Sequence, residues 1–268
     1  MVAPKLTAAL VKEYNDLFNS CEINPERTEE VEAIVQRIVM FQNRYEGVAT
    51  TSGVPWHVIA AIHNMECSLN FGEHLHNGDP LTARTVHDPK GLPKSGQPPF
   101  EWEASALDAL GHDNLTTWSD WSVSGICYKL EGYNGWGSRS HDINTPYLWS
   151  YSNHYTKGKY IADSKWSPTA VSQQCGAMVI LRRMVELGSI DLASPASPKP
   201  VKSDALRDVG YSLFPPADPR RLEQVQDLQR LLNSVAGVSL RVDGIAGSRT
   251  SDAYKMVTGN YLTGDPRA

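Results

Sequence analysis

The 268-residue sequence lacks any apolar run of the roughly 20 residues that a membrane-spanning helix needs. It also lacks an excess of positive charge, since its formal net charge is −5, and this argues against a nucleic-acid-binding protein. The GxGxxG, P-loop and GxSxG motifs of nucleotide-binding folds and serine hydrolases are absent too. What remains is the ordinary composition of a soluble globular protein, with 41% hydrophobic and 21% charged residues.

Closely spaced cysteines and a secretory leader are also missing. Cys21, Cys67, Cys127 and Cys175 form no CxxC pair, which argues against a zinc ribbon or a thioredoxin motif. Each has mostly apolar or small neighbours, so we expect buried free thiols. Residues 1–17 are amphipathic and lack the continuous apolar core of a signal peptide. We therefore expect synthesis in a cytoplasm, or a leader already removed.

Apolar residues recur at helical spacing along most of the chain, which predicts a mainly α-helical protein. Residues 72–99 and 132–165, rich in turn-forming residues, are expected to be largely irregular. In the first half of the chain, helices are expected over residues 6–17, from Asn24 and Pro25 to Gly47, from Pro55 to Glu66, and over 100–110 and 118–129. Farther on, one helix is expected from Ser167 and Pro168 to Gly188, another from Pro219 onward, and a last one that Ser248 caps.

A proline-rich stretch suggests where the chain divides. Pro195, Pro198 and Pro200 predict a semi-stiff, exposed spacer. We therefore expect a large helical domain over residues 1–190, a linker over 191–204 and a small three-helix domain over 205–268.

Glu66 is the most unusual charged residue of the chain. No Asp, Glu, Lys or Arg lies between Glu46 and Glu66, and Glu66 shares a helix face with Ile59 and Ile62. Partial burial there raises the pKa of a carboxyl group. A raised pKa suits a general acid that must be protonated to donate to a glycosidic oxygen. A solvated glutamate at a fraying helix end is the plainer alternative.

Two short motifs resemble those of the lysozyme-like clan, which includes goose-type lysozymes and lytic transglycosylases. Residues 66–71 resemble its Glu-Ser-x-x-x-Phe stretch, with Cys67 in place of Ser. Residues 133–135 resemble its Tyr-Asn-x-Gly segment, with one residue fewer. Residues 74–85 and 147–160 resemble phage endolysins and prophage-like proteins of that fold. The resemblance, over roughly 50–185, implies a lysozyme-like fold with Glu66 as general acid.

Other candidate site residues follow from glycosidase chemistry. A second carboxylate activates water in many glycosidases, and we predict Asp79 for this role, ahead of Asp88, Glu73 and Glu101. Thr85 or Thr82 would orient the water. Asp79 also lies in an Asn-Gly-Asp-Pro stretch typical of turns. Aromatic rings stack on sugars and amides can bind N-acetyl groups. Predicted substrate-binding residues are Tyr133, Asn134, Tyr147 and His154.

Two other catalytic sites were considered. His74, His76 and His87 with Asp88 have the residue types of a zinc site, but their spacing is not specific. Cys67 or Cys127 with His141 or His154 would form a cysteine amidase site if the fold joined them. We favour neither, and expect no metal and no cofactor.

The C-terminal residues carry a further motif. Asp243, Gly244, Gly247 and Thr250 match the Asp-Gly-x-x-Gly-x-x-Thr signature of the peptidoglycan-binding three-helix domain, which residues 207–268 resemble. The motif is mostly structural, because glycines permit a tight turn and Thr250 falls in the first turn of the last helix. Members of that family usually carry the module beside a wall hydrolase.

Together the observations predict a monomeric endolysin-type muramidase that binds bacterial peptidoglycan, without nucleic acid or a membrane span, and acts at the cell wall. It would hydrolyse the bond between N-acetylmuramic acid and N-acetylglucosamine. A lytic transglycosylase using Glu66 without Asp79 is the first alternative. A catalytically inactive wall-binding or virion protein is the second, and chitin cleavage stays open.

Overall fold

The computed structural model describes residues 3–162, 164–192, 207–233, 235 and 238–268. These residues form a mainly helical protein with ten α-helices and one two-stranded hairpin, which confirms the expected helical class. Within this part of the chain, every helix is too short or too polar to cross a membrane. The predicted linker lies outside the described residues except for Asp191 and Leu192, so the proposed domain division stays a prediction.

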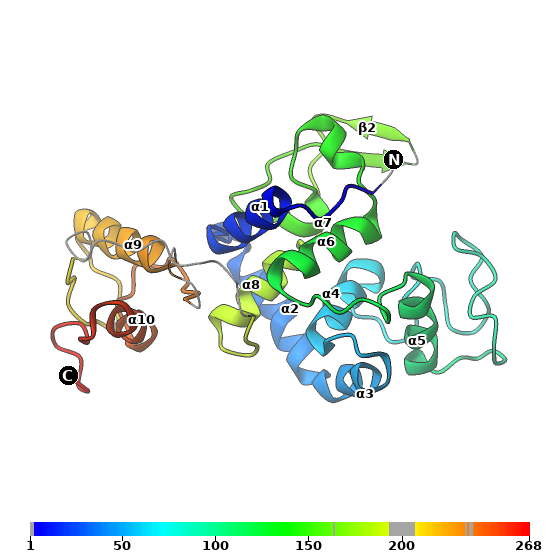
Figure 1. Cartoon of the computed structure of the whole chain (residues 1–268), viewed down its shortest axis with the longest axis horizontal. Coiled ribbons are helices and arrows are strands. Elements are labelled where there is room, and N and C mark those ends of the chain that lie inside the picture. Colours follow the sequence, from blue (N-terminus) through cyan, green and yellow to red (C-terminus); the bar gives the residue numbers. More distant parts are fainter. Residues whose placement is uncertain (1–2, 163, 193–206, 234, 236–237) are drawn as a thin grey trace.

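The larger part of the molecule is built around α4 (Trp56–Cys67) and α8 (Ala177–Glu186), which pack against each other (Figure 1). Around them lie α1 (Ala8–Asn19), α2 (Thr28–Met40), α3 (Gln42–Ser52), α5 (Trp102–His112), α6 (Val123–Asn134) and α7 (Pro146–Trp149). Two short 3-10 helices, η1 (Pro25–Arg27) and η2 (Gly137–His141), and the antiparallel strands β1 (Lys159–Ala162) and β2 (Lys165–Ser167) complete this part.

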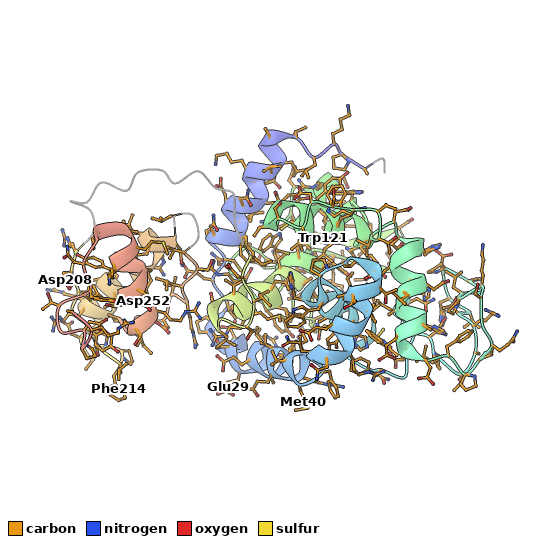
Figure 2. The ribbon with its side chains drawn as sticks, turned by 60° about the horizontal axis from the view of Figure 1, so that its bottom comes forward. Glu29, Met40, Trp121, Asp208, Phe214 and Asp252 are labelled. Carbon is orange, nitrogen blue, oxygen red and sulfur yellow. The ribbon has the colours of Figure 1, made fainter. Side chains whose placement is uncertain are left out.

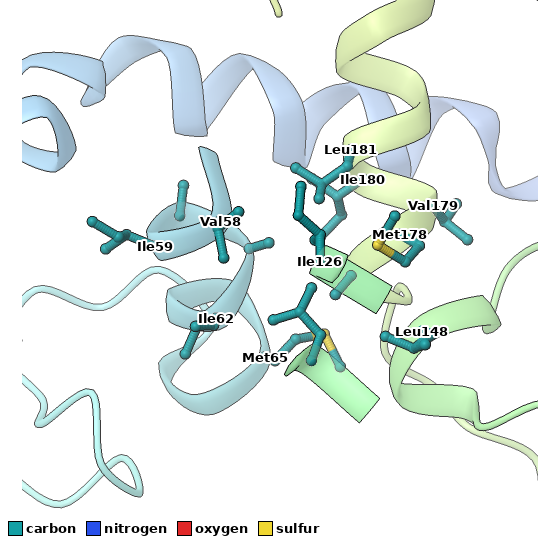
Figure 3. Close-up of a cluster of buried hydrophobic side chains, with 14 of the residues drawn as sticks. Val58, Ile59, Ile62, Met65, Ile126, Leu148, Met178, Val179, Ile180 and Leu181 are labelled. Atoms are coloured by element: carbon teal, nitrogen blue, oxygen red, sulfur yellow. The ribbon is translucent and has the colours of Figure 1, made fainter. Parts of the chain in front are cut away.

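The core explains why α4 forms where the sequence is almost free of charge. Nine of its twelve residues are buried. Val58, Ile62 and Met65 meet Ile126 of α6, Leu148 of α7 and residues 178–181 of α8 (Figure 3). Burying such side chains stabilises the fold by about 1.5–3 kcal/mol each. The helix that carries Glu66 is therefore fixed by the centre of the core.

Several predicted helices have different bounds in the structure. The helix expected from Pro25 to Gly47 is three separate elements, η1, α2 and α3, and the helical conformation is interrupted at Phe41 between α2 and α3. Gly47 lies inside α3 and does not end it. Helix α3 is ended instead by Gly53, its C-cap, whose φ of 74° is the left-handed conformation that glycine adopts readily. Continuous apolar spacing across the break concealed it, because α2 and α3 bury faces in the same core.

The helix expected from Ser167 begins later, at Ala177. Val171 is 48% exposed, so its helical spacing from Cys175 does not reflect a buried face. A Cβ atom on Gly176 would lie 2.3 Å from the carbonyl oxygen of Leu148, so the chain enters α8 by close backbone contact with α7. Helix α6 differs too, because it begins at Val123 with Ser122 as its cap and extends to Asn134.

The C-terminal residues form a second hydrophobic cluster, over Val225 to Leu262. From residue 207 on, the described residues hold two helices, α9 (Pro219–Asn233) and α10 (Ser248–Thr258), and not the three expected. Gly247, not Ser248, is the N-cap of α10. Phe214 projects from the surface of this part (Figure 2) and is 76% exposed.

Charged and polar contacts join this part to α8 and to Glu22, which lies between α1 and η1. The buried Arg182 guanidinium donates to the carbonyl oxygen of Leu240 at 2.8 Å, and Arg249 donates to that of Val185 at 2.9 Å. Arg230 forms an ion pair with Glu22 at 2.8 Å. The C-terminal part therefore packs at the end of α8 through oriented polar groups.

Candidate functional site

Glu66 lies in the last turn of α4, where the chain leaves the core abruptly. Ser68 and Leu69 follow with φ angles of 48° and 61°, a conformation that residues other than glycine seldom adopt. Backbone strain of this kind concentrates at functional sites. The carbonyl oxygens of Asn64 and Met65 accept from the Gln174 amide, at 3.3 and 2.5 Å, so the helix end is held in place.

The Glu66 carboxyl group is poorly hydrated, and from the described residues it receives a single direct hydrogen bond. Burial is the main reason why its pKa is raised to about 7, and the nearby charge of Asp113 raises it further. The hydrogen bond from the Tyr147 hydroxyl acts in the opposite direction and lowers the pKa. The hydroxyl of Tyr147 donates to Glu66 Oε1 at 2.9 Å. At neutral pH a large fraction of Glu66 is therefore protonated, as a proton donor requires.

Two tyrosines form one wall beside this carboxyl group. The ring of Tyr133 is nearly parallel to that of Tyr147, with centroids 6.5 Å apart. The Tyr133 hydroxyl donates to the carbonyl oxygen of Leu75 at 3.1 Å, and, besides burial, the charge of Asp113 helps to raise the pKa of Tyr133. Burial raises the pKa of both tyrosines well above the usual value, so both stay neutral hydrogen-bond donors.

Asp113 is the site residue that the sequence did not reveal. It follows α5 directly, and its partial burial raises the pKa of its carboxyl group. It reaches the site because α5 packs against α3, which in turn packs against α4. Nothing in its local sequence distinguishes it from an aspartate at an ordinary helix end. Only the packing of these helices shows that it and Glu66 influence each other.

Asp79 has a different environment. Its Oδ2 atom accepts from the backbone N–H groups of Val86 and His87 at 2.7 and 3.0 Å, and its Oδ1 lies 2.6 Å from His87 Nδ1. Burial acts to raise its pKa, but these hydrogen bonds outweigh it and lower the pKa to about 2. A carboxylate with both oxygens engaged and so low a pKa is a weak base. The geometry favours Asp79 as an anchor of its loop.

Thr85 has a comparable position. Its hydroxyl donates to the carbonyl oxygen of Pro89 at 2.5 Å and accepts from the Leu92 N–H at 3.0 Å. The hydroxyl thus donates one hydrogen bond and accepts another within the loop, so its proton is not available to orient a water molecule. The loop itself reaches Glu66 at Gly78, where a Cβ atom would lie 2.9 Å from the carbonyl oxygen of Glu66.

The remaining predicted substrate-binding residues are separated in the structure. Asn134 ends α6 and is exposed, with its amide 3.5 Å from the Thr145 hydroxyl. His154 lies against α1, with Nε2 at 2.8 Å from the carbonyl oxygen of Leu17. Burial lowers the pKa of this imidazole. Asn134 therefore belongs with Tyr147 in the cleft, and His154 belongs to the packing of α1.

Two hollows adjoin the Glu66 turn. One, of about 480 Å³, is lined by β1 and by Tyr147. Its walls include Met65, Asn134, Ser138, Tyr147, Lys159, Tyr160, Ile161 and Gln174. The other, of about 350 Å³, contains Arg37, Asn64, Ser68 and Leu69, and Gln174 lines both. The two hollows thus flank the end of α4 and suit an extended ligand more than a compact one.

The alternative catalytic centres have little support. Among the described residues, no three His, Cys, Asp or Glu side chains gather as a metal site would require. Each of the three histidines is hydrogen-bonded to a different partner, His74 to Ser105, His76 to Asp108 and His87 to Asp79. The four cysteines are free and buried, as expected. Burial raises the pKa of Cys67 and Cys127, which disfavours the thiolate that a nucleophile needs.

The C-terminal motif holds one loop against α9. Asp243 Oδ1 accepts from the Gln229 amide and the Ile245 N–H, both at 2.9 Å. Thr250 donates to the carbonyl oxygen of Ile245 at 3.2 Å. Gly244 has a φ of 74°, which favours glycine, and a Cβ atom there would lie 2.2 Å from Leu222 Cδ1. Gly247 caps α10. These four residues shape the fold of this part.

Comparison with protein-family models, with curated proteins and with solved structures gave no significant match. The chemistry of the Glu66 site is the best indication of function.

Proposed function

We propose that this protein is a peptidoglycan-cleaving glycosidase, a muramidase of the endolysin type, with Glu66 as its general acid. One observation carries the proposal: burial holds the pKa of Glu66 at about 7, while Tyr147 fixes one of its oxygens. A carboxyl group of this kind can donate a proton to a glycosidic oxygen near neutral pH. The likeness of residues 66–71 and 133–135 to lysozyme-like motifs supports the same chemistry.

In this mechanism Glu66 protonates the oxygen between N-acetylmuramic acid and N-acetylglucosamine, and the carboxylate left behind is stabilised by the Tyr147 hydroxyl. Water then attacks the sugar carbon as its bond to the protonated glycosidic oxygen breaks, and the water gives one proton to a carboxylate acting as base. Asp113 is a better candidate than Asp79 to accept that proton, because its charge acts on Glu66, whereas both oxygens of Asp79 are engaged in the loop.

The shape of the site supports a polymeric substrate. The hollows on the two sides of the α4 end share Gln174, and a glycan strand crossing them would pass Tyr147. The C-terminal part, which carries the motif of wall-binding modules, would raise the local concentration of the enzyme on the wall. We propose bacterial peptidoglycan as the partner and the cell wall as the place of action.

The test is mass spectrometry of the fragments that purified sacculi release with the wild-type protein and with Glu66→Gln. Reducing N-acetylmuramic acid ends that disappear in the variant are expected. Free stem peptides that persist in the variant would refute glycan cleavage. Sacculi that bind the protein but release nothing would favour the inactive wall-binding alternative.

A lytic transglycosylase is the second candidate, and the environment of Asp79 favours it. With both Asp79 oxygens engaged in the loop, Asp113 is the candidate left to activate water among the described carboxyl groups whose charge acts on Glu66. In a transglycosylase the 6-hydroxyl of the substrate attacks instead, and 1,6-anhydro ends would appear in the same mass spectra. Asp113→Asn is then expected to retain most activity, whereas a hydrolase should lose at least tenfold.

A further inference from the structure

Lys159 is the only charged residue among the described residues that line the 480 Å³ hollow beside Tyr147. It begins β1 and is partly buried. The other walls are neutral amides, hydroxyls and aromatic or aliphatic groups. Within the described part of the chain, the Lys159 ammonium group has no hydrogen bond or ion pair, so its three donors remain available.

The position of this ammonium group relates it to the Glu66 site. Tyr147 lines the hollow, and its hydroxyl is bonded to Glu66 Oε1 at 2.9 Å. A ligand group held in the hollow is thus separated from the proton donor by one side chain. Asn134 and Gln174 line the same space and can hydrogen-bond neutral amides.

We propose that this hollow is a subsite for a carboxylate carried by the substrate, with Lys159 as the residue that recognises it. The proposal rests on the proposed function and adds a reason for substrate choice. A lone ammonium group in a partly desolvated hollow favours an anion, because charge-assisted hydrogen bonds are stronger there than in open water. Lys159 would therefore favour peptidoglycan over chitin, whose sugars carry no carboxylate.

The carboxylate has two possible sources. In strands without peptides it is the free lactyl group of N-acetylmuramic acid. In intact peptidoglycan the lactyl group is joined to the stem peptide, and the carboxylates belong to that peptide. The same ammonium chemistry serves both, so the ligands used in the test must separate them.

The test measures dissociation constants by calorimetry on the full chain carrying Glu66→Gln, which prevents cleavage during the titration. Three soluble ligands are compared: a peptide-free tetrasaccharide with lactyl carboxylates, the same tetrasaccharide with stem peptides, and chitotetraose. Lys159→Met is the test variant and Lys159→Arg the conservative one. Lys165→Met is the matched control, because Lys165 lies in the same hairpin and is exposed but does not line the hollow.

Lys159→Met is expected to weaken binding of at least one carboxylate ligand about tenfold and to change chitotetraose binding by less than twofold. Lys159→Arg and Lys165→Met should bind like the parent. Loss with the peptide-free ligand alone identifies the lactyl group, and loss with the peptide ligand alone identifies the stem peptide. Equal loss for all three ligands, or no loss for any, would overturn the subsite. Failure of the proposed function would appear separately, as the absence of released fragments with wild-type protein.

Discussion

The end of α4 and the loop that follows it hold two carboxyl groups in opposite environments. Glu66 projects from a helix packed in the core, is short of hydrogen-bond donors, and has a pKa raised to about 7. Asp79 lies in an irregular loop, accepts from two backbone N–H groups and a histidine ring, and has a pKa lowered to about 2. The number of hydrogen-bond donors around a carboxyl group, more than its burial, decides whether it is suited to donating a proton or to holding a loop.

The largest expected effect is on catalysis. Glu66→Gln should lower the rate of glycan release by about 10²–10⁴-fold, because a general acid contributes on that scale. Asp79→Asn should lower the rate less than tenfold, while it reduces the free energy of unfolding by about 1–3 kcal/mol through lost hydrogen bonds to a charged group. Rates on sacculi and urea unfolding curves measure the two effects. Equal losses of rate in both variants would contradict the assignment of Glu66 as the proton donor and of Asp79 as an anchor of the loop.

The pH dependence should show the contrast as well. Glycan release should fall about tenfold per pH unit above about pH 7, as Glu66 loses its proton. Because the folded-state pKa of Glu66 is raised, its contribution to stability decreases between about pH 4.5 and 7 and stays reduced above that range. Asp79 has a lowered pKa, so its contribution is present above about pH 4 and is lost towards pH 2.

A stability measurement at pH 8 isolates the Glu66 part of this behaviour. There Glu66→Gln should be more stable than wild type by about 3 kcal/mol, since it removes a poorly solvated charge. At pH 4 the two proteins should be nearly equal in stability. A variant less stable than wild type at pH 8 would mean that Glu66 is well solvated.

The contact between the two regions is itself testable. Gly78 and Gly91 have similar φ angles, 78° and 75°, so alanine strains the backbone at both. Only at Gly78 would the new Cβ atom meet the Glu66 carbonyl oxygen, at 2.9 Å, whereas Gly91 has open space. Gly78→Ala should therefore unfold about 1–2 kcal/mol more easily than Gly91→Ala and lose more activity. Equal behaviour would show that the loop can shift without affecting Glu66.

The smallest expected effect concerns Tyr147. Its hydroxyl lowers the pKa of Glu66, so Tyr147→Phe should raise that pKa and move the alkaline limb of the activity profile upward by less than one pH unit. The pH–rate profile measures it. A downward movement would mean that the hydroxyl favours the protonated carboxyl group.

The sequence predicted the parts of the site that depend on local pattern. The uncharged stretch before Glu66 indicated a buried helix, and the motifs pointed to Tyr133 and Tyr147. It did not reveal Asp113, because α5 brings this residue to the site only through tertiary packing. Asp79 and Thr85 were singled out by residue type, but the hydrogen bonds that engage them depend on a loop conformation that the pattern does not encode. The apolar spacing across Phe41 likewise concealed the break between α2 and α3.

A carbon-13 NMR titration of the side-chain carboxyl groups, with Glu66 assigned by comparison with Glu66→Gln, measures the pKa of the proposed proton donor directly. We expect a midpoint near pH 7 for Glu66, coinciding with the alkaline limb of glycan release. A midpoint near the usual value of about 4.5 for a glutamate would contradict this expectation, because Glu66 would then carry no proton to donate at neutral pH.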